Sequence, residues 1–220
     1  MTLTTRKPTG VVPWPLLLVE GEEKSGKSWM VAALSASPRI GRCLWVELGS
    51  EGTADQYGAI PGADYEVVEH NGTWAGLTQI VRDATVEAQA AQDAGERPVM
   101  LAIDTGTAEW DLIKEIADQR ARNSKYGRKI LADDQNADVP IDRGHWTYAT
   151  DLHYEHFIEP LKRFPGIAVI IARGKEVSGT DSNGKPIAGS KEYRVEGQKN
   201  LGYDCHAWIR LSRTPPPRGV

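Results

Sequence analysis

The segment that most constrains the fold of this chain is the eight-residue stretch from Gly21 to Ser28, which reads GEEKSGKS. It fits the pattern G-x-x-x-x-G-K-[ST] at every fixed position. Glycines let a backbone wrap closely around phosphate groups with its N–H groups pointing inward. An apolar run precedes the loop, and a helical pattern that carries Trp29, Ala32 and Ala33 follows it. Strand, loop and helix together predict a phosphate-binding loop.

The residue types in this loop predict a role for each side chain. Lys27 would reach the β- and γ-phosphates of a nucleoside triphosphate, and Ser28 would ligate Mg²⁺. ATP and Mg²⁺ are therefore the expected cofactors. The expected nucleotide site comprises nine consecutive residues: Gly21, Glu22, Glu23, Lys24, Ser25, Gly26, Lys27, Ser28 and Trp29.

Apolar runs of strand length alternate with helical patterns along the rest of the chain. Strands are expected at 16–19, 43–48, 65–69, 99–103, 166–172 and 206–211, and helices from about 26, over 73–95, through 110–117 and over 146–164. The polar residues 121–144 predict a loop, and residues 175–197 predict a long hairpin with its turn at Asn183–Gly184. This alternation favours an α/β fold, a mostly parallel sheet with helices on both faces.

Length and composition suit a single domain in a reducing compartment. The 220 residues divide into a flexible arm (1–12), one domain (13–213) and a Pro-rich tail (214–220). The two cysteines, Cys43 and Cys205, lack metal-ligand spacing and are too few for a disulfide scaffold. Prolines interrupt the apolar stretch 11–19, so we expect no signal peptide, and no stretch has the length to span a membrane. We expect a cytoplasmic protein without membrane contact.

Asp104 follows the predicted strand 99–103 directly. A buried strand that ends in a carboxylate can hold the water shell of Mg²⁺ beside Ser28, so Asp104 is the second candidate metal residue. The alternative is that Asp104 caps the next helix, a role that also suits Thr105 and Thr107.

Residues 44–57 resemble the RecA-type ATPase core, in which a catalytic glutamate near a strand end is followed four residues later by an aspartate. Glu51 and Asp55 have that spacing. The resemblance implies that Glu51 orients the attacking water, with Glu47, nearer the strand end, as the alternative. Together with Lys27, these two glutamates are the candidate catalytic residues.

The segments 21–28, 44–55, 99–104 and 167–175 occur in the order that a RecA-like ATPase needs. Over roughly residues 14–213, the chain resembles small phage-encoded RecA-like ATPases, some of which act in single-strand annealing or recombination. The resemblance implies a RecA-like P-loop NTPase core with a C-terminal β-hairpin, in which strand 167–172 lies between the phosphate-loop strand and the Asp104 strand. It also implies ATP hydrolysis, the host cytoplasm, a ring or filament of identical subunits, and other phage replication or recombination proteins as partners.

The resemblance also suggests residues that sense nucleotide or complete a neighbour's site. Arg173 stands where RecA-like proteins commonly carry glutamine or another uncharged polar residue, and Lys175 could instead touch phosphate or DNA. Because this family usually binds ATP at a subunit interface, three cations are candidates for a trans-acting role: Lys175, Lys199 and Arg210.

Two regions resemble DNA-facing loops because they mix cations with an aromatic residue. The cations expected to contact single-stranded DNA are Lys125, Arg128 and Lys129 in the first region, and Lys185, Lys191 and Arg194 in the hairpin. Tyr126 and Tyr193 could stack on bases. Three aspartates, at 133, 134 and 138, leave a plain solvated loop as the alternative for the first region. The net charge of −4 means that binding would rest on local cations.

Two other functional classes stay open. A nucleotide kinase also begins with a phosphate-binding loop, and its lid could draw on Arg120, Arg122, Arg128 and Arg143. A non-hydrolysing ATP-dependent switch would lack catalytic carboxylates, whereas Glu47, Glu51 and Asp104 are all present.

Overall fold

One sheet of seven strands runs through the part of the chain that the computed structural model describes, residues 3–49, 52–181 and 185–213. Its strands are β1 (Leu16–Gly21), β2 (Cys43–Glu47), β3 (Glu66–Val67), β4 (Met100–Asp104), β5 (Ile167–Thr180), β6 (Pro186–Glu196) and β7 (Ala207–Leu211). The order is β3-β2-β4-β5-β1-β7 with parallel neighbours, and β6 pairs antiparallel with β5. The prediction of a mostly parallel α/β sheet is confirmed, and β5 lies between β1 and β4.

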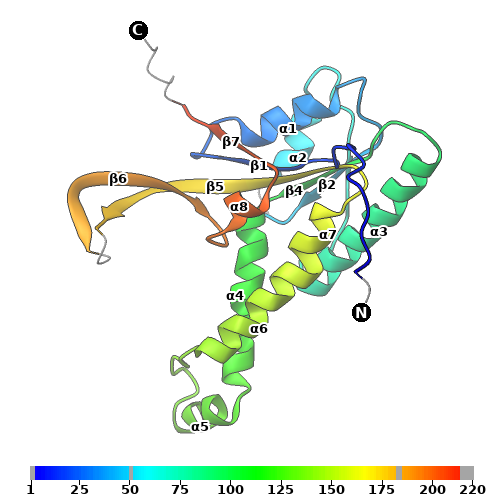
Figure 1. Ribbon diagram of the computed structural model, residues 1–220. Coiled ribbons are helices and arrows are strands. Elements are labelled where there is room, and N and C mark those ends of the chain that lie inside the picture. The colour runs from blue at the N-terminus through cyan, green and yellow to red at the C-terminus, as the bar shows by residue number, and fades with distance from the viewer. Residues whose placement is uncertain (1–2, 50–51, 182–184, 214–220) are drawn as a thin grey trace.

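Helices cover both faces of this sheet (Figure 1). On one face lie α1 (Lys27–Ser35) and α2 (Thr53–Tyr57); on the other lie α3 (Trp74–Asp93), the π-helical turn η1 (Tyr154–Ile158) and α7 (Glu159–Lys162). Side chains of β4 alternate between the two cores, with Leu101 and Ile103 facing α3, and Met100 and Ala102 facing α1. All five β4 residues are buried because both faces are covered.

The predicted helix from residue 73 shows how sequence sets the boundaries of an element. Thr73 Oγ1 accepts a hydrogen bond from the backbone N–H of Gly76 at 3.0 Å and caps α3. Leu77, Val81 and Ala84 are buried along one stripe of the helix, so burial of that stripe stabilises it.

The prediction that residues 121–144 form a loop is wrong. Helix α4 (Gly106–Arg122) extends into this region, α5 (Lys125–Asp133) follows, and α6 (Arg143–His153) begins at its end. Ser124 Oγ accepts from the Gly127 N–H at 2.9 Å, and Asp142 Oδ1 accepts from the His145 N–H at 3.0 Å. Only Gly127 of this short helix is buried, so α5 places no apolar stripe in the core; the polar caps Ser124 and Asp142 were the available signal.

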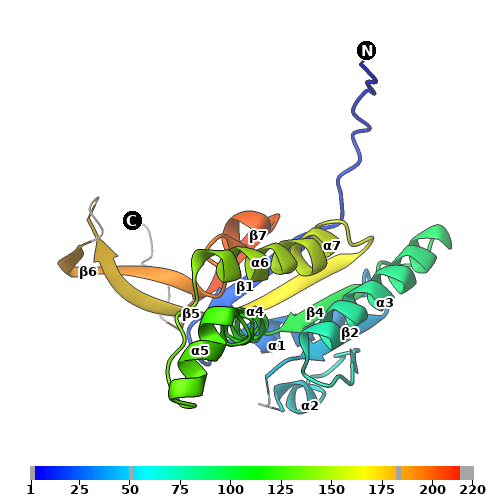
Figure 2. The same ribbon diagram turned by 90° about the horizontal axis from the view of Figure 1, so that it is seen from below.

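Two projections leave the sheet in different directions. Helices α4 and α6 extend together and carry α5 at their far end, whereas the β5–β6 hairpin extends elsewhere in both views (Figures 1 and 2). The helical stretch predicted over 146–164 begins at Arg143 with α6, continues through η1 and α7, and ends at Lys162, just beyond Pro160. The predicted hairpin is confirmed, although its turn at 183–184 lies outside the described residues. No helix in the described part of the chain combines the length and apolar character needed to cross a membrane.

Candidate functional site

A cavity of about 620 Å³ lies where β1, β4 and β5 meet the loop before α1. Open parallel sheets commonly bind ligands beyond the carboxyl ends of their strands. Five segments line the cavity: Glu23, Lys24, Gly26, Lys27 and Ser28 from the loop and α1; Thr53, Gln56 and Tyr57 from α2; Asp104 and Thr105 after β4; Arg173 and Gly174 from β5; and Glu196 from β6.

Two glycines allow the backbone conformation and close packing of the phosphate loop. Gly26 has a φ of 92° and sits at the N-cap of α1, which points the positive end of that helix at the cavity. A Cβ atom at Gly21 would lie 2.2 Å from the backbone oxygen of Leu211, so no larger residue fits there. Lys27 Nζ donates to the backbone oxygens of Gly21 and Glu22, at 3.0 and 2.7 Å, so its ammonium lies against the loop itself.

The predicted metal residues Ser28 and Asp104 come together. Ser28 Oγ donates to Asp104 Oδ2 at 2.9 Å, although 76 residues separate them. Thr105, not Asp104, caps α4, because its Oγ1 accepts from the Ala108 N–H at 3.0 Å. The capping alternative for Asp104 is therefore excluded, and its carboxylate faces the cavity.

Of the two candidate catalytic glutamates, Glu47 has a structural contact. Glu47 Oε1 accepts from both the backbone N–H and the hydroxyl of Thr53, at 2.7 and 2.8 Å. It thereby fixes the start of α2, which presents Gln56 and Tyr57 to the cavity. Glu51 lies outside the described residues.

The donors and acceptors of this cavity fit a polyphosphate with a hard divalent cation. Hydroxyl and carboxylate oxygens, as on Ser28 and Asp104, are ligands that Mg²⁺ prefers. Lys27 and the N-terminus of α1 supply positive charge for phosphate oxygens. Ser25 Oγ, within the loop, is buried without a hydrogen-bond partner among the described residues, although Ser25 does not line the cavity. Trp29, also predicted here, is half exposed and does not line the cavity.

A set of contacts that the sequence did not predict joins the cavity to the hairpin. Arg173 pairs with Glu196 in the β5–β6 register. Thr107 Oγ1 donates to the backbone oxygen of Glu196 at 2.6 Å and accepts from the Arg173 N–H at 3.0 Å. Lys175 Nζ forms an ion pair with Glu196 Oε1 at 2.9 Å. Only the strand register, which no local motif encodes, brings Glu196 to this position.

A second unpredicted group lies beneath the phosphate loop. The Glu20 carboxylate is fully buried and forms an ion pair with Arg210 of β7. The Arg210 guanidinium lies over the rings of Tyr193 and Trp208, at 4.3 and 5.2 Å from their centroids. Burial and the nearby Glu20 carboxylate raise the pKa of Tyr193 to about 12. Arg210, a predicted trans-acting residue, is thus engaged within its own chain.

The two predicted groups of DNA-contacting cations lie on separate projections. Lys125, Arg128 and Lys129 are exposed on α5, at the far end of α4 and α6 (Figure 1). On the hairpin, Lys191 pairs with Glu176 at 2.6 Å and Arg194 pairs with Glu192 at 2.8 Å. The exposed Lys185 donates its backbone N–H to Asp181 at 2.9 Å. The structure therefore does not bring the two groups together.

No family model matches the chain, and no curated protein matches its sequence.

Proposed function

We propose that this protein is a RecA-like P-loop ATPase that acts on single-stranded DNA in phage recombination or replication. The observation that carries the proposal is the hydrogen bond of Ser28 to Asp104 beside a loop with the P-loop sequence. The strand order, with β5 between β1 and β4, agrees with the RecA-type resemblance.

In this proposal each group of the cavity has one task. Loop N–H groups and Lys27 bind the β- and γ-phosphates, while Ser28 and Asp104 hold Mg²⁺ and its water shell. Mg²⁺ would neutralise charge on the phosphate oxygens. Glu51 remains the predicted group that orients the attacking water, and the contact of Glu47 with Thr53 supports that assignment.

The positions of two arginines argue against the kinase alternative, which needs arginines in a lid over the nucleotide. The Arg120 guanidinium lies 4.0 Å from the centroid of the Tyr148 ring, and Arg122 pairs with Asp118 at 2.8 Å within α4. Neither arginine lines the cavity. A lid over the nucleotide would require both to leave these contacts.

The test is ATP turnover with and without single-stranded DNA, in the wild type and in Lys27→Ala. We expect turnover to fall roughly 10²–10³-fold in this variant, because it loses positive charge at the phosphates. Arg82→Ala, an exposed cation on α3, is the matched control and should turn over as the wild type does.

Wild-type turnover in purified Lys27→Ala would contradict the phosphate-binding assignment. Phosphoryl transfer to a nucleoside monophosphate, without stimulation by DNA, would favour the kinase instead.

A further inference from the structure

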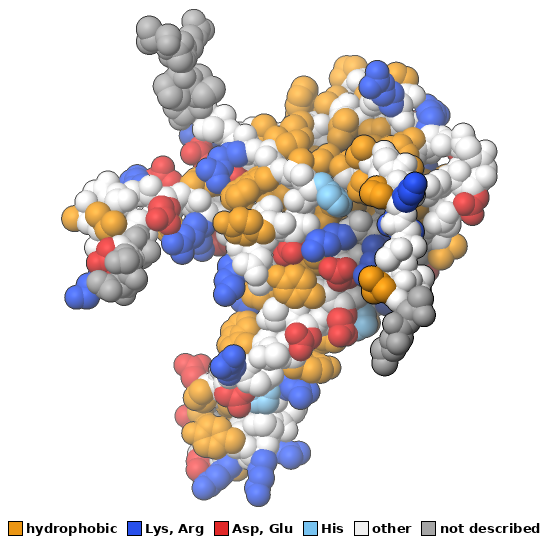
Figure 3. Space-filling model, in the orientation of Figure 1, with side chains coloured by type: hydrophobic (Ala, Val, Ile, Leu, Met, Phe, Trp, Pro, Cys, Tyr) orange, Lys and Arg blue, Asp and Glu red, His pale blue; other side chains and the backbone are white. Residues whose placement is uncertain are grey.

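A second cavity, of about 590 Å³, lies between the base of the β5–β6 hairpin, α4, α8 (Leu201–Asp204) and β7. We call it the aromatic groove, and its aromatic and cationic lining comprises Trp110, Lys114, Lys175, Tyr193, Arg194, Lys199, Tyr203 and Trp208. Hydrophobic and basic side chains lie side by side around α8 and the hairpin base (Figure 3). The groove shares one wall with the phosphate-loop cavity, since Glu196 lines both.

Two aromatic rings of the groove face solvent. Tyr203 is 90% exposed and Trp208 is 46% exposed. A Cβ atom at Gly202 would lie 2.8 Å from the Trp208 ring, so this ring rests against the backbone of α8. The Arg210 guanidinium also lies over this ring. Trp208 is therefore held by its neighbours, whereas the Tyr203 ring adds nothing to the core.

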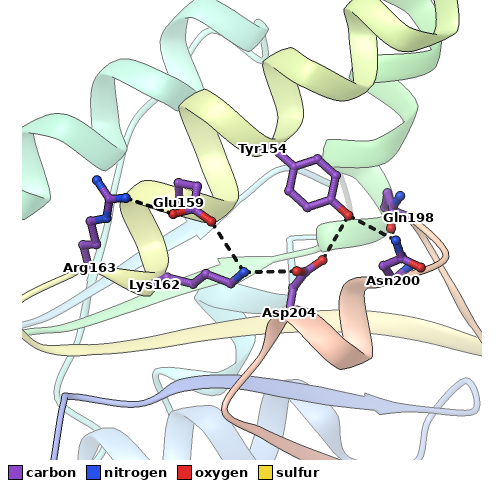
Figure 4. A network of polar contacts seen from close by, with 7 residues as sticks. All are labelled: Tyr154, Glu159, Lys162, Arg163, Gln198, Asn200 and Asp204. Atoms are coloured by element: carbon purple, nitrogen blue, oxygen red, sulfur yellow. Dashed lines mark hydrogen bonds and ion pairs between the residues drawn. The ribbon is translucent and has the colours of Figure 1, made fainter.

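The short helix that carries Tyr203 is fixed by a polar network (Figure 4). The Asp204 carboxylate accepts from Lys162 Nζ at 3.1 Å and from Tyr154 Oη at 3.2 Å. Asn200 Nδ2 donates to Tyr154 Oη at 3.4 Å. The network anchors Asn200 and Asp204, on either side of Tyr203, through their side chains and does not use the Tyr203 ring. The helix that carries the ring is therefore held in place before a ligand binds, and the ring stays open to solvent.

Cations outnumber carboxylates in the lining of the groove. Four cations line it, Lys114, Lys175, Arg194 and Lys199, against one lining carboxylate, Glu196. Lys114 also pairs with Asp111 and Arg194 with Glu192, both of which lie outside the lining. The net formal charge of the chain is −4. Ion pairs such as Lys175–Glu196 involve half-exposed side chains, so they are weak and a stronger anion can replace them.

We propose that the aromatic groove binds single-stranded polynucleotide, with a base stacked on Tyr203 and backbone phosphates at the groove's cations. This inference rests on the proposed function and names the surface that contacts the nucleic acid. Aromatic faces beside cations match such a ligand, because every base has a π-face and every nucleotide carries a phosphate charge. A protein partner would not require an excess of cations beside the exposed rings.

The experiment measures fluorescence anisotropy of labelled oligo-dT and oligo-rU with the full chain, ATP and Mg²⁺ at low salt. Tyr203→Ala should raise the Kd at least about fivefold, since stacking on one aromatic ring is worth roughly 1–3 kcal/mol per base. Tyr203→Phe keeps the ring and should bind as the wild type does. The oligo-dT and oligo-rU series show whether the groove takes DNA, RNA or both.

Tyr126→Ala tests the rival site predicted on α5, because Tyr126 is also strongly exposed, and on this inference it should bind as the wild type does. Loss of binding in Tyr126→Ala but not in Tyr203→Ala would overturn the inference and move the contact to α5. Absence of binding by the wild type would overturn it as well, and would favour the groove as a protein-docking surface. Basal ATP turnover in the same samples, compared with Lys27→Ala, tells separately whether the ATPase assignment stands.

Discussion

Glu47 and Glu51 are four residues apart, and their variants separate a structural carboxylate from a catalytic one. We expect Glu51→Gln to bind ATP but to lose turnover by roughly 10²–10⁴-fold, the range typical of a positioned acid or base. Glu47→Gln should lower turnover much less, because the glutamine oxygen can still accept hydrogen bonds from Thr53. Single-turnover hydrolysis and fluorescent-ATP binding measure both effects.

The opposite outcome would reassign the role. Collapse of turnover in Glu47→Gln with normal turnover in Glu51→Gln would make Glu47 the water-orienting group. Normal turnover in both variants would remove this segment from the catalytic site.

Some residues of the site were predictable from sequence and others were not. The proximity of Ser28 and Asp104 was predictable because the phosphate loop follows β1 and Asp104 ends β4, so both lie at the same edge of a parallel sheet. The pair of Glu20 with Arg210 spans 190 residues. No local pattern reports such a contact, since it depends on β7 lying next to β1.

The same contrast holds for elements. The strand before the phosphate loop and helix α3 have clear apolar patterns and were predicted with small boundary errors. Helix α5 was missed because it packs mainly through a glycine: a Cβ atom at Gly127 would lie 2.1 Å from the Ala121 backbone oxygen. From the sequence alone, a glycine that lets two backbone segments pack closely cannot be told from a glycine in a loop.

Helices α4 and α6 are joined by a buried ionisable pair, Glu109 and His153, with 2.8 Å between Oε1 and Nδ1. Burial raises the pKa of Glu109, and the hydrogen bond to His153 only partly offsets this. The Glu109 carboxyl group therefore keeps its proton in the folded protein at pH values where it has lost that proton in the unfolded chain. The resulting stability is present below the ordinary carboxyl pKa of about 4.5 and is lost as pH rises through the folded value.

Glu109→Gln removes this titration. The free energy of unfolding is measured in urea at a series of pH values. As pH rises from about 4.5, Glu109→Gln should become more stable relative to the wild type. Glu115→Gln, on an exposed position of the same helix, should show no such trend. If the free energies of unfolding of Glu109→Gln and wild type differ by the same amount at every pH, the pKa of Glu109 is not raised in the folded protein.

At the scale of the whole molecule, we predict a nucleotide-promoted ring or filament in which a neighbour completes the ATP site. Mixing wild-type protein with Lys27→Ala subunits should then reduce turnover by more than the fraction of variant added. Light scattering with ATP should give a mass above that of the 24.1 kDa chain. Proportional dilution of activity together with a monomer mass would contradict assembly.

The overall architecture was partly accessible from sequence. Alternating apolar strands and helical patterns predicted the layered sheet, because each element needs a face to bury. The place of β5 between β1 and β4 came only from the resemblance to RecA-like proteins, because periodicity carries no information about strand order. The direction of the helical projection was not predictable, since it follows from the packing of α4 on α6 around Ile113, Ala117 and Ala149.

Strand β5 has 14 residues and two different surroundings. Residues 168–171 pair with both β1 and β4 in the buried sheet, whereas residues 173–178 pair with β6. Amide hydrogen exchange should therefore be slow up to about Arg173 and much faster beyond it, within a single unbroken strand. Arg173 and Gly174 line the phosphate-loop cavity, and Lys175 lines the aromatic groove. Nucleotide should therefore protect amides near Arg173 and Gly174, and polynucleotide should protect amides from Lys175 onward. Uniform exchange along the strand would show that the hairpin and the sheet open as one unit.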